Sequence, residues 1–283
     1  MKCYICGKSS FKTISPFVRD NENIKVLECT NCSLISLSTF NHIKKSHYEE
    51  SKMHTDGFTL DQWIKETEID DERRFNFLKD KIVNKKILDF GCGNGNFLIK
   101  SKKITSISEG IEIEKKNYSY FKKNNLKVYD SIKAALKNNN KFDLVTAFHV
   151  FEHLSNPLEI LIELKNLIQD NGEIIIEVPN SDDSLISLHD LIAFKKFTFW
   201  SQHLFLFNQF NFTTLVKKSG LKINWIKQIQ RYSLANNLYW LSKNKPGGHK
   251  NWTFLNNINL NNEYENALAS VGKCDTILIS VVK

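Results

Sequence analysis

The sequence lacks a long hydrophobic run: no stretch of about 18 or more uncharged apolar residues occurs, which excludes an ordinary membrane-spanning helix. Its first ten residues, MKCYICGKSS, lack the apolar core of a secretory signal, so we expect a cytoplasmic protein. Proline is scarce, at 4 residues, and the 41% hydrophobic and 25% charged residues are typical of a globular protein. The 283 residues suffice for one sizeable α/β domain plus a small accessory module.

Arginine-rich tracts and RNA-binding signatures are also absent. The net charge of +8 comes from lysines scattered among Glu and Asn along the whole chain, as at Lys115–Lys116 and Lys122–Lys123. A basic surface can serve nucleic acid, anionic glycans or phosphorylated substrates, but a dispersed charge is typical of a solvated surface. We therefore expect a small-molecule partner and not nucleic acid. Nothing in the sequence indicates the oligomeric state.

Cysteine is limited to six residues, and four of them form two CxxC pairs near the N-terminus. Twenty-two residues separate the pairs, and a small residue, Gly7 or Ser33, follows each of them. Without a secretory signal, this spacing favours a metal over a disulfide framework or a redox dithiol. Four soft thiolates suit a structural Zn²⁺ with no open coordination position. The predicted zinc ligands are Cys3, Cys6, Cys29 and Cys32.

The pattern along the chain predicts three parts. Residues 1–40 form a zinc-ribbon module, which is too short to build an adequate core without metal. Residues 41–84 form a helical connector or lid, with an amphipathic helix over about 60–83, and Tyr48 and Phe58 are candidates to cover an active-site mouth. Residues 85–283 form the main domain, and an insertion at about 181–250 between the core strands is expected to carry the specificity for the bound partner.

The main domain opens with a strand, a glycine-rich turn and a helix start. The strand KILDF is followed at once by Gly91-Cys92-Gly93-Asn94-Gly95, whose glycines let the backbone approach a ligand closely. The spacing is GxGxG, which differs from the dinucleotide fingerprint GxGxxG. Asp89 at the strand end would repel a pyrophosphate and suits a cationic ligand.

The segment LDFGCGNG resembles the first motif of the class I S-adenosylmethionine methyltransferase family. The resemblance implies that the glycine loop cradles the amino-acid part of the cofactor, with Asp89 near it. Glu112 lies 21 residues after Gly91, the spacing expected of a ribose-binding acid. The family also implies that Asp130 meets the adenine amine, with Ser131 beside it. The predicted cofactor-binding residues are Asp89, Gly91, Cys92, Gly93, Gly95, Glu112, Asp130, Ser131 and Phe148.

Strands and helices alternate at regular spacing through residues 86–180, which predicts a doubly wound parallel sheet. The helix PLEILIELKNLIQ is expected to close at Asn171-Gly172, before the strand GEIIIEVPN. The segments LKINWIKQIQR and DTILISVV complete a mostly parallel seven-stranded sheet, the last strand being antiparallel as in the resembling family.

The stretch HVFEHL, with NP and NGEIIIEVPN after it, resembles a branch of this family that includes sugar and small-molecule methyltransferases. Zinc-carrying members of that branch act on nucleotide-linked sugars. The resemblance implies O-methylation of a sugar, a nucleotide sugar or another phosphorylated small molecule in surface-glycan biosynthesis, with residues at the end of the fourth strand bordering cofactor and acceptor. The alternatives are an RNA methyltransferase that grips RNA with the zinc ribbon, a quinone methyltransferase, and a non-catalytic zinc scaffold.

Methyl transfer to an oxygen of high pKa needs a base, and histidine suits neutral pH. His149 follows the fourth strand directly, where ligands bind in open α/β sheets. His153 lies one helical turn later, and His203 lies in the aromatic-rich segment KKFTFWSQHLFLFN. All three are candidate bases; Glu152, or no base at all, remains open.

Overall fold

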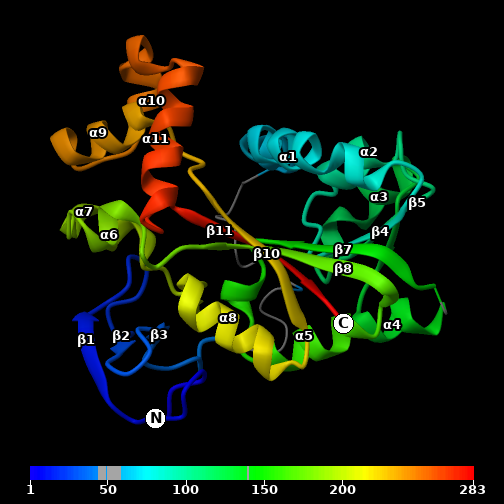
Figure 1. The fold of residues 1–283 in the computed structure, drawn as a ribbon, viewed down its shortest axis with the longest axis horizontal. Helices are drawn as coiled ribbons and strands as arrows, with labels where there is room; N and C mark the ends of the chain where they lie inside the picture. The colour runs from blue at the N-terminus through cyan, green and yellow to red at the C-terminus, as the bar shows by residue number, and fades with distance from the viewer. Residues whose placement is uncertain (44–48, 50–58, 139) are drawn as a thin grey trace.

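The computed structural model describes residues 1–43, 49, 59–138 and 140–283. Tyr48 and Phe58, the candidates to cover an active-site mouth, lie outside these residues. Within the described part of the chain, no helix is both long and apolar enough to span a bilayer. Figure 1 shows a central sheet with helices on both faces and an additional lobe formed by α9, α10 and α11.

The seven-stranded sheet confirms the predicted fold. Its strand order is β10-β11-β8-β7-β4-β5-β6, in which β11 is antiparallel to both of its neighbours and the remaining pairs are parallel. The strands are β4 (Lys86–Phe90), β5 (Ile107–Ile111), β6 (Lys127–Tyr129), β7 (Phe142–Phe148), β8 (Ile168–Pro179), β10 (Lys222–Ile229) and β11 (Thr276–Val282).

Helices cover both faces because successive strand residues point to opposite sides of the sheet. In β8, Ile174 and Ile176 pack with the buried side chains of α4, α5 and α8, whereas Ile175 packs with those of α1, α2 and α3. Both faces are therefore apolar, as a central parallel sheet requires. The helices are α1 (Leu60–Ile82), α2 (Asn96–Ser101), α3 (Tyr118–Lys123), α4 (Ile132–Lys137), α5 (Pro157–Lys165) and α8 (Gln209–Lys218).

The start of helix α1 and the end of helix α5 each have an identifiable local cause. Helix α1 begins at a capping box. The Thr59 side chain accepts a hydrogen bond from the Gln62 backbone amide, and the Gln62 side chain accepts one from the Thr59 backbone amide. Helix α5 ends at Lys165, so the expected closure at Asn171-Gly172 is wrong. Strand β8 already begins at Ile168, opposite Phe142, and Gly172 lies inside it. A Cβ at Gly172 would lie 2.9 Å from the Phe142 carbonyl oxygen, so close backbone approach explains this glycine.

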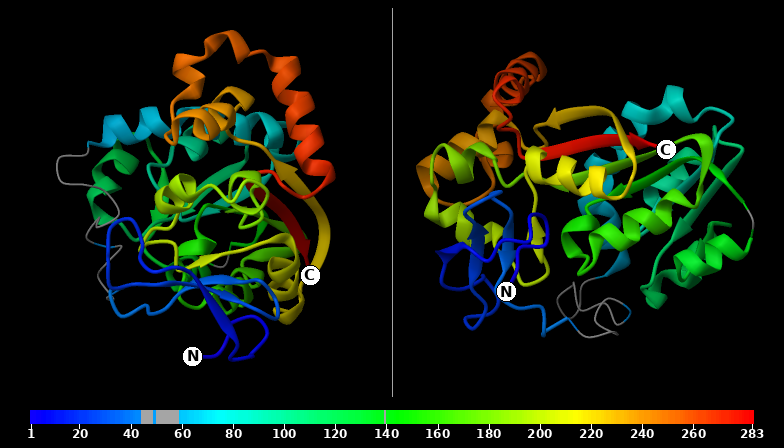
Figure 2. Two further views of the ribbon diagram at one scale, coloured as in Figure 1. Left: turned by 90° about the vertical axis from the view of Figure 1, so that its left-hand side faces the viewer. Right: turned by 60° about the horizontal axis from the view of Figure 1, so that its bottom comes forward.

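The N-terminal module is a small antiparallel sheet that the main domain completes. It contains β1 (Phe11–Ser15), β2 (Val26–Cys29) and β3 (Ile35–Leu37), and its fourth strand is β9 (Phe205–Leu206). The pairing joins Ile35 to Leu206, and Figure 2 shows the blue strands against the yellow-green segment. The division at residue 40 stays a prediction, but the sheet itself crosses it.

The predicted insertion at about 181–250 contains one additional segment after β8, another after β10, and between them two elements of the core. Helices α6 (Ser184–Ser187) and α7 (Ile192–Thr198) and strand β9 follow β8, after which α8 and β10 return to the central sheet. The lobe between β10 and β11 contains α9 (Leu234–Lys243), α10 (Gly248–Asn251) and α11 (Ile258–Ser270). Short 3-10 helices occur at η1 (Lys115–Asn117), η2 (Phe151–His153) and η3 (Thr253–Leu255).

Phe205 anchors the junction between the two sheets. It is 1% exposed, and its ring centroid lies 5.2 Å from those of both Tyr4 and Phe40. We expect Phe205→Ala to lower the free energy of unfolding by about 3–5 kcal/mol, because it removes a buried ring and leaves a cavity. Phe254, which is 79% exposed, is the matched control, and Phe254→Ala should change stability by less than about 0.5 kcal/mol. Urea unfolding measures both, and equal effects would contradict the packing described here.

Candidate active site

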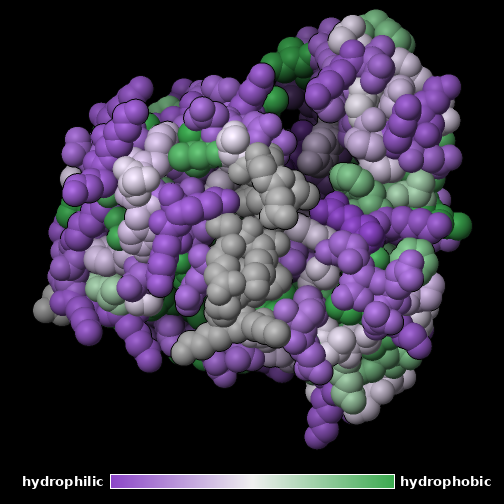
Figure 3. Space-filling model, turned by 180° about the vertical axis from the view of Figure 1, so that it is seen from behind, coloured by the Kyte–Doolittle hydropathy of each residue, from purple (hydrophilic) through white to green (hydrophobic). Residues whose placement is uncertain are grey.

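A cavity of about 470 Å³ lies at the carboxyl ends of β4, β5 and β7, beneath α1. This is the edge at which open α/β sheets bind ligands. Figure 3 shows a hollow between the lobe of α9–α11 and the rest of the molecule, on a mostly hydrophilic face. The cavity is lined by Trp63, Glu66, Thr67, Asp70, Asp71, Arg74, Asp89, Phe90, Gly91, Cys92, Gly93, Asn94, Phe97, Ile111, Glu112, Ile113, Glu114, Phe148, His149, Val150, His153, Leu154 and Arg231.

The glycine loop forms one wall of the cavity, and its glycines are required by geometry. Gly91, Gly93 and Gly95 have φ values of 70°, 56° and 76°, in the left-handed region. A Cβ at Gly91 would also lie 2.6 Å from a Val150 methyl carbon. The Gly91 and Cys92 amides donate to the Ile111 carbonyl at 2.8 and 3.1 Å, which ties the loop to the end of β5. The loop predicted from sequence therefore presents bare backbone to the cavity.

Two predicted carboxylates flank this loop. Asp89 is 4% exposed and accepts a 2.7 Å hydrogen bond from the Thr146 hydroxyl; burial raises its pKa to about 7. Glu112 accepts from the amides of Gly93 and Glu114 at 2.8 and 2.9 Å, and burial raises its pKa also. Both carboxylates line the cavity in fixed orientations. They are placed to meet a cation and a pair of hydroxyl groups, respectively.

The remaining predicted cofactor residues divide between the cavity and its surroundings. Cys92 and Phe148 line the cavity, the latter at the end of β7. Asp130 and Ser131 are not among the described residues that line it. The Ser131 hydroxyl caps α4 by accepting from the Ala134 amide at 3.2 Å and donates to Asp130 at 2.8 Å. Their contact with adenine stays a prediction.

Helix α1 contributes more to the site than the sequence indicated. Trp63, Thr67, Asp71 and Arg74 line the cavity at helical spacing, on one face of α1. Asn94 of the glycine loop donates to the Thr67 hydroxyl at 2.8 Å, which joins helix and loop. The amphipathic pattern predicted that α1 packs on the main domain, but it gave no separate signal for a ligand-facing side.

Glu177 of β8 holds α1 to the sheet through a buried ion-pair network. Its carboxylate has no exposed surface and accepts from Arg73 at 2.9 Å and from Arg74 at 2.8 Å. Although burial opposes ionisation, Arg74, His149 and Arg73 hold the pKa of Glu177 well below its usual range. Asp70 extends the network to Arg231 beside the α9–α11 lobe. Sequence reasoning missed the roles of Arg73, Arg74 and Glu177.

The three candidate histidine bases converge on Glu152, at the cavity wall. His149 has φ 55°, and its Nδ1 donates to Glu152 Oε1 at 3.1 Å. Its Nε2 lies 3.2 Å from Glu177 Oε1, although the two atoms are not aligned for a hydrogen bond. Burial opposes ionisation of Glu152, yet the nearby histidines lower its pKa to about 2.

His153 and His203 complete this cluster. His153 Nδ1 donates to the Gln202 carbonyl at 2.8 Å, and burial lowers the pKa of His153. The ring centroids of His153 and His203 lie 5.1 Å apart. Burial, with His153 beside it, lowers the pKa of His203 to about 3, so His203 is neutral near pH 7. His149 and His153 line the cavity, whereas His203 lies behind them. Which of the three acts as a base stays a prediction.

The comparisons with known proteins decide the family. The model of the methyltransferase domain family matches residues 62–224, more than half of the chain, and includes the glycine loop and the histidine cluster up to His203. The chain belongs to this methyltransferase family. The chain also resembles a solved S-adenosylmethionine-dependent methyltransferase from Thermotoga maritima. The match covers 79% of this chain and 93% of that protein, with a TM-score of 0.51 and 16% sequence identity, which shows the shared fold.

Curated relatives of this methyltransferase domain have different acceptors in their names. The ubiquinone biosynthesis O-methyltransferase of Glaesserella parasuis is 28% identical over 122 residues, 38% of this chain and 52% of that protein. The tRNA U34 carboxymethyltransferase of Campylobacter hominis is 28% identical over 149 residues, 47% of this chain and 52% of that protein. The chain thus spans about half the length of these relatives.

The residues of the site fit S-adenosylmethionine. The glycine loop lines the cavity with left-handed backbone at which a Cβ would meet Val150 or Trp63, Asp89 suits the cationic end, and Glu112 suits the ribose hydroxyls. A volume of about 470 Å³ is within the range of small-molecule sites. When bound, this cofactor supplies an electrophilic methyl group on a sulfonium.

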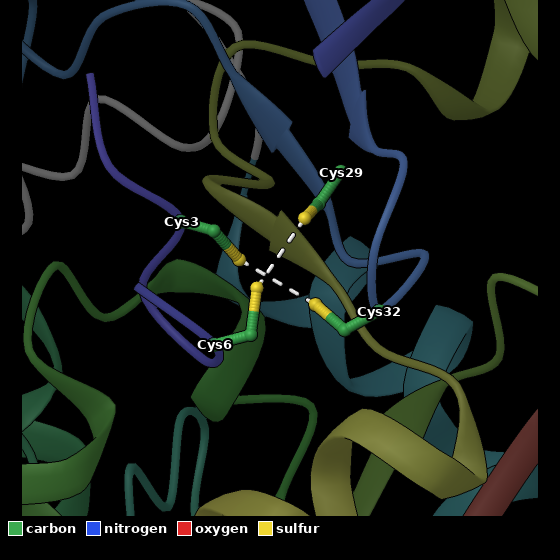
Figure 4. A group of neighbouring side chains, drawn as sticks. All are labelled: Cys3, Cys6, Cys29 and Cys32. Atoms are coloured by element: carbon green, nitrogen blue, oxygen red, sulfur yellow. Dashed lines mark hydrogen bonds between the residues drawn. The ribbon is translucent and has the colours of Figure 1, made fainter. Parts of the chain in front are cut away.

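The four N-terminal cysteines converge outside this cavity (Figure 4). The sulfur atoms of Cys3 and Cys32, and those of Cys6 and Cys29, lie 3.5 Å apart, all four atoms lie within 4.8 Å of one another, and all are free thiols. A tetrahedral Zn²⁺ with bonds of about 2.3 Å needs sulfur atoms about 3.8 Å apart, so the cluster fits this ion. Gly7 and Ser33 donate to the carbonyls of Cys3 and Cys29 at 2.9 and 2.8 Å, which closes the expected turns.

Zinc occupancy is tested by chelation under reducing conditions. Structural zinc contributes about 10–16 kcal/mol of binding free energy in zinc-finger peptides, so we expect its removal to lower the melting temperature and to expose residues 1–40 to protease. Metal analysis should show that one tightly held zinc per chain is lost in Cys3→Ser and retained in Cys274→Ser, whatever the occupancy of other sites. Full zinc retention in Cys3→Ser would disprove the assigned ligand set.

Asp89 predicts a pH-dependent cofactor affinity. Because its pKa is raised to about 7, it is protonated at lower pH and cannot attract a cation. We expect the dissociation constant of S-adenosylmethionine to rise about tenfold as the pH falls from about 8 to about 6. Calorimetry across this range measures the effect. In Asp89→Asn the affinity should be weak and flat with pH; an unchanged pH profile in that variant would assign the effect to another group.

Proposed function

We propose that this protein uses S-adenosylmethionine to methylate a hydroxyl group of a small polyhydroxylated acceptor, a sugar or nucleotide-linked sugar. The proposal is carried by one observation: a histidine–carboxylate cluster lies on the wall of the cavity that the glycine loop forms. The glycine loop and proton-accepting groups thus line the same cavity. This is what oxygen methylation requires of a protein, namely alignment, exclusion of water and a place for the proton.

The acceptor class rests on the chemistry of the cavity. Glu66, Thr67 and Asp71 of α1 line it together with Glu114, and such side chains accept hydrogen bonds from sugar hydroxyls. They suit a polyhydroxylated ring better than the apolar ring of a quinone. The surface-glycan role is an inference from the resemblance to sugar methyltransferases, since the relatives named above are quinone and tRNA enzymes.

An RNA acceptor is the second candidate, favoured by the tRNA-modifying relative and the net charge of +8. The lining of the cavity opposes it. Six carboxylates line the described cavity, at positions 66, 70, 71, 89, 112 and 114, against the two guanidinium groups of Arg74 and Arg231. Such a lining repels a phosphate backbone, which basic side chains must otherwise neutralise. By the same argument, the sugar of a nucleotide-linked acceptor enters the cavity and its phosphates stay outside.

The chain's residues have separable tasks in the proposed reaction. Asp89 and Glu112 hold the two ends of the cofactor, and α1 covers the cavity. The acceptor hydroxyl would lose its proton to a histidine of the cluster while its oxygen takes the methyl group. The bound cofactor would supply that methyl group and keep the electron pair of the broken carbon–sulfur bond. His153 can receive this proton at Nε2, because its Nδ1 carries the hydrogen donated to the Gln202 carbonyl.

Release of S-adenosylhomocysteine over an acceptor panel tests the function. We expect turnover with nucleotide sugars or phosphorylated small molecules, and none with a quinol or tRNA. Among His149→Ala, His153→Ala and His203→Ala, loss of the base should lower kcat by about 10²–10⁴-fold with cofactor affinity retained. The exposed His189 is the control. Near-native turnover in all three variants would exclude a histidine base, and cofactor binding without turnover on any acceptor would favour the non-catalytic scaffold.

A further inference from the structure

Glu152, His153 and His203 form a second group of potential metal ligands besides the four cysteines. One ligand atom from each residue lies within 4.8 Å of the others. The three come from two segments far apart in the chain: Glu152 and His153 are in η2, and His203 follows α7. Two imidazoles and one carboxylate on one side of a centre leave coordination positions open, unlike a closed four-thiolate site.

Buried polar atoms without partners point to a missing ligand at this place. Oε2 of Glu152 and Nδ1 of His203 are both buried and lack a hydrogen-bond partner in the structure. The whole Glu152 side chain is 0% exposed, so an unpartnered oxygen there carries a substantial free-energy cost. A cation between these atoms would satisfy both.

The surrounding hydrogen bonds orient the three residues as ligands. His153 Nδ1 donates to the Gln202 carbonyl, which leaves Nε2 as the ring nitrogen with a lone pair. Metal-binding histidines are commonly fixed in this way, through the other ring nitrogen. His149 donates to Oε1 of Glu152, which fixes the carboxylate and leaves Oε2 for another partner. The Trp200 ring packs edge-on against the His203 ring, with the two ring centroids 5.5 Å apart, and bounds the cluster on another side.

We propose that Glu152, His153 and His203 bind a divalent transition-metal cation whose open positions face the cavity. Mixed imidazole and carboxylate ligands suit Mn²⁺, Fe²⁺, Co²⁺ or Zn²⁺. Of the three residues, His153 lines the cavity, so the open side is the side from which an acceptor enters. This part rests on the proposed function and replaces the histidine base within it, because Nε2 of His153 cannot bind the cation and accept a proton at once. The cation binds the acceptor hydroxyl as a further ligand and lowers its pKa, so that its proton leaves to water as the oxygen takes the methyl group.

Mn²⁺ is the probe because it prefers carboxylate and imidazole to thiolate, so the four cysteines do not compete for it. Full-length protein, with its cysteine site loaded with zinc, is titrated with Mn²⁺ and the free ion is followed by electron paramagnetic resonance. We expect one Mn²⁺ per chain. In Glu152→Gln and His203→Gln the dissociation constant should rise at least about tenfold. His189→Gln, which removes an exposed histidine, should leave it unchanged.

A second measurement avoids dependence on the folding of the variants. The wild-type Mn²⁺ complex should show hyperfine coupling to directly bound imidazole nitrogen. Absence of Mn²⁺ binding, binding without such coupling, or equal binding in all variants overturns the site. Methyl transfer by chelator-treated protein that binds no Mn²⁺ would reject this site and leave the proposed function standing. Mn²⁺ binding in a protein that does not bind S-adenosylmethionine would support the metal site and reject the proposed function.

Discussion

The buried carboxylate of Glu177 is the constraint on which the candidate site depends. A fully desolvated negative charge in a central strand is costly unless cations reach it, and Arg73 and Arg74 do so from α1. Losing one partner of such a buried pair typically costs about 3–5 kcal/mol. Helix α1 is therefore held over the sheet, and with it the wall formed by Trp63 and Thr67. Helix α1 thus forms one wall of the cavity because the buried charge of Glu177, behind that wall, requires the guanidinium groups that α1 carries.

The same carboxylate connects that cover to the histidine cluster. His149 lies between Glu177 and Glu152, so two acidic residues on different elements share one imidazole. The left-handed backbone of His149 places it there at the end of β7, and this conformation is uncommon for a residue with a Cβ. Such strain persists where surrounding contacts over-determine it, which is frequent at functional sites. Helix α1, the end of β7 and the histidine cluster are thus connected through the charges of Glu177 and Glu152 around His149.

Local patterns in the sequence predicted what depends on neighbours along the chain. The apolar runs and their spacing predicted the sheet, the glycines at 91, 93 and 95 predicted the loop, and the amphipathic pattern predicted α1. The end of α5 was misplaced because an Asn-Gly pair is typical both of a helix end and of a close backbone approach within a strand. A glycine alone does not distinguish the two.

What the sequence did not reveal depends on contacts between distant residues. In the sequence, Glu177 is a single acidic residue in a predicted strand. Arg73 and Arg74 are two charged residues on a predicted helix that carries many others. Their pairing spans about a hundred positions and leaves no periodic signal. The two-residue strand β9 is too short for any strand pattern. The convergence of His203 with His153 has the same origin, since only the fold brings residues 50 positions apart into contact.

Strand β9 has a consequence for the independence of the two modules. The short segment that contains it also carries Trp200, Gln202 and His203, so one end pairs with β3 while the other packs into the histidine cluster. Strand β3 begins three residues after Cys32, so two short paired strands join the four sulfur atoms to the segment that carries His203. Neither cluster therefore has a scaffold of its own, although more than a hundred residues separate them along the chain.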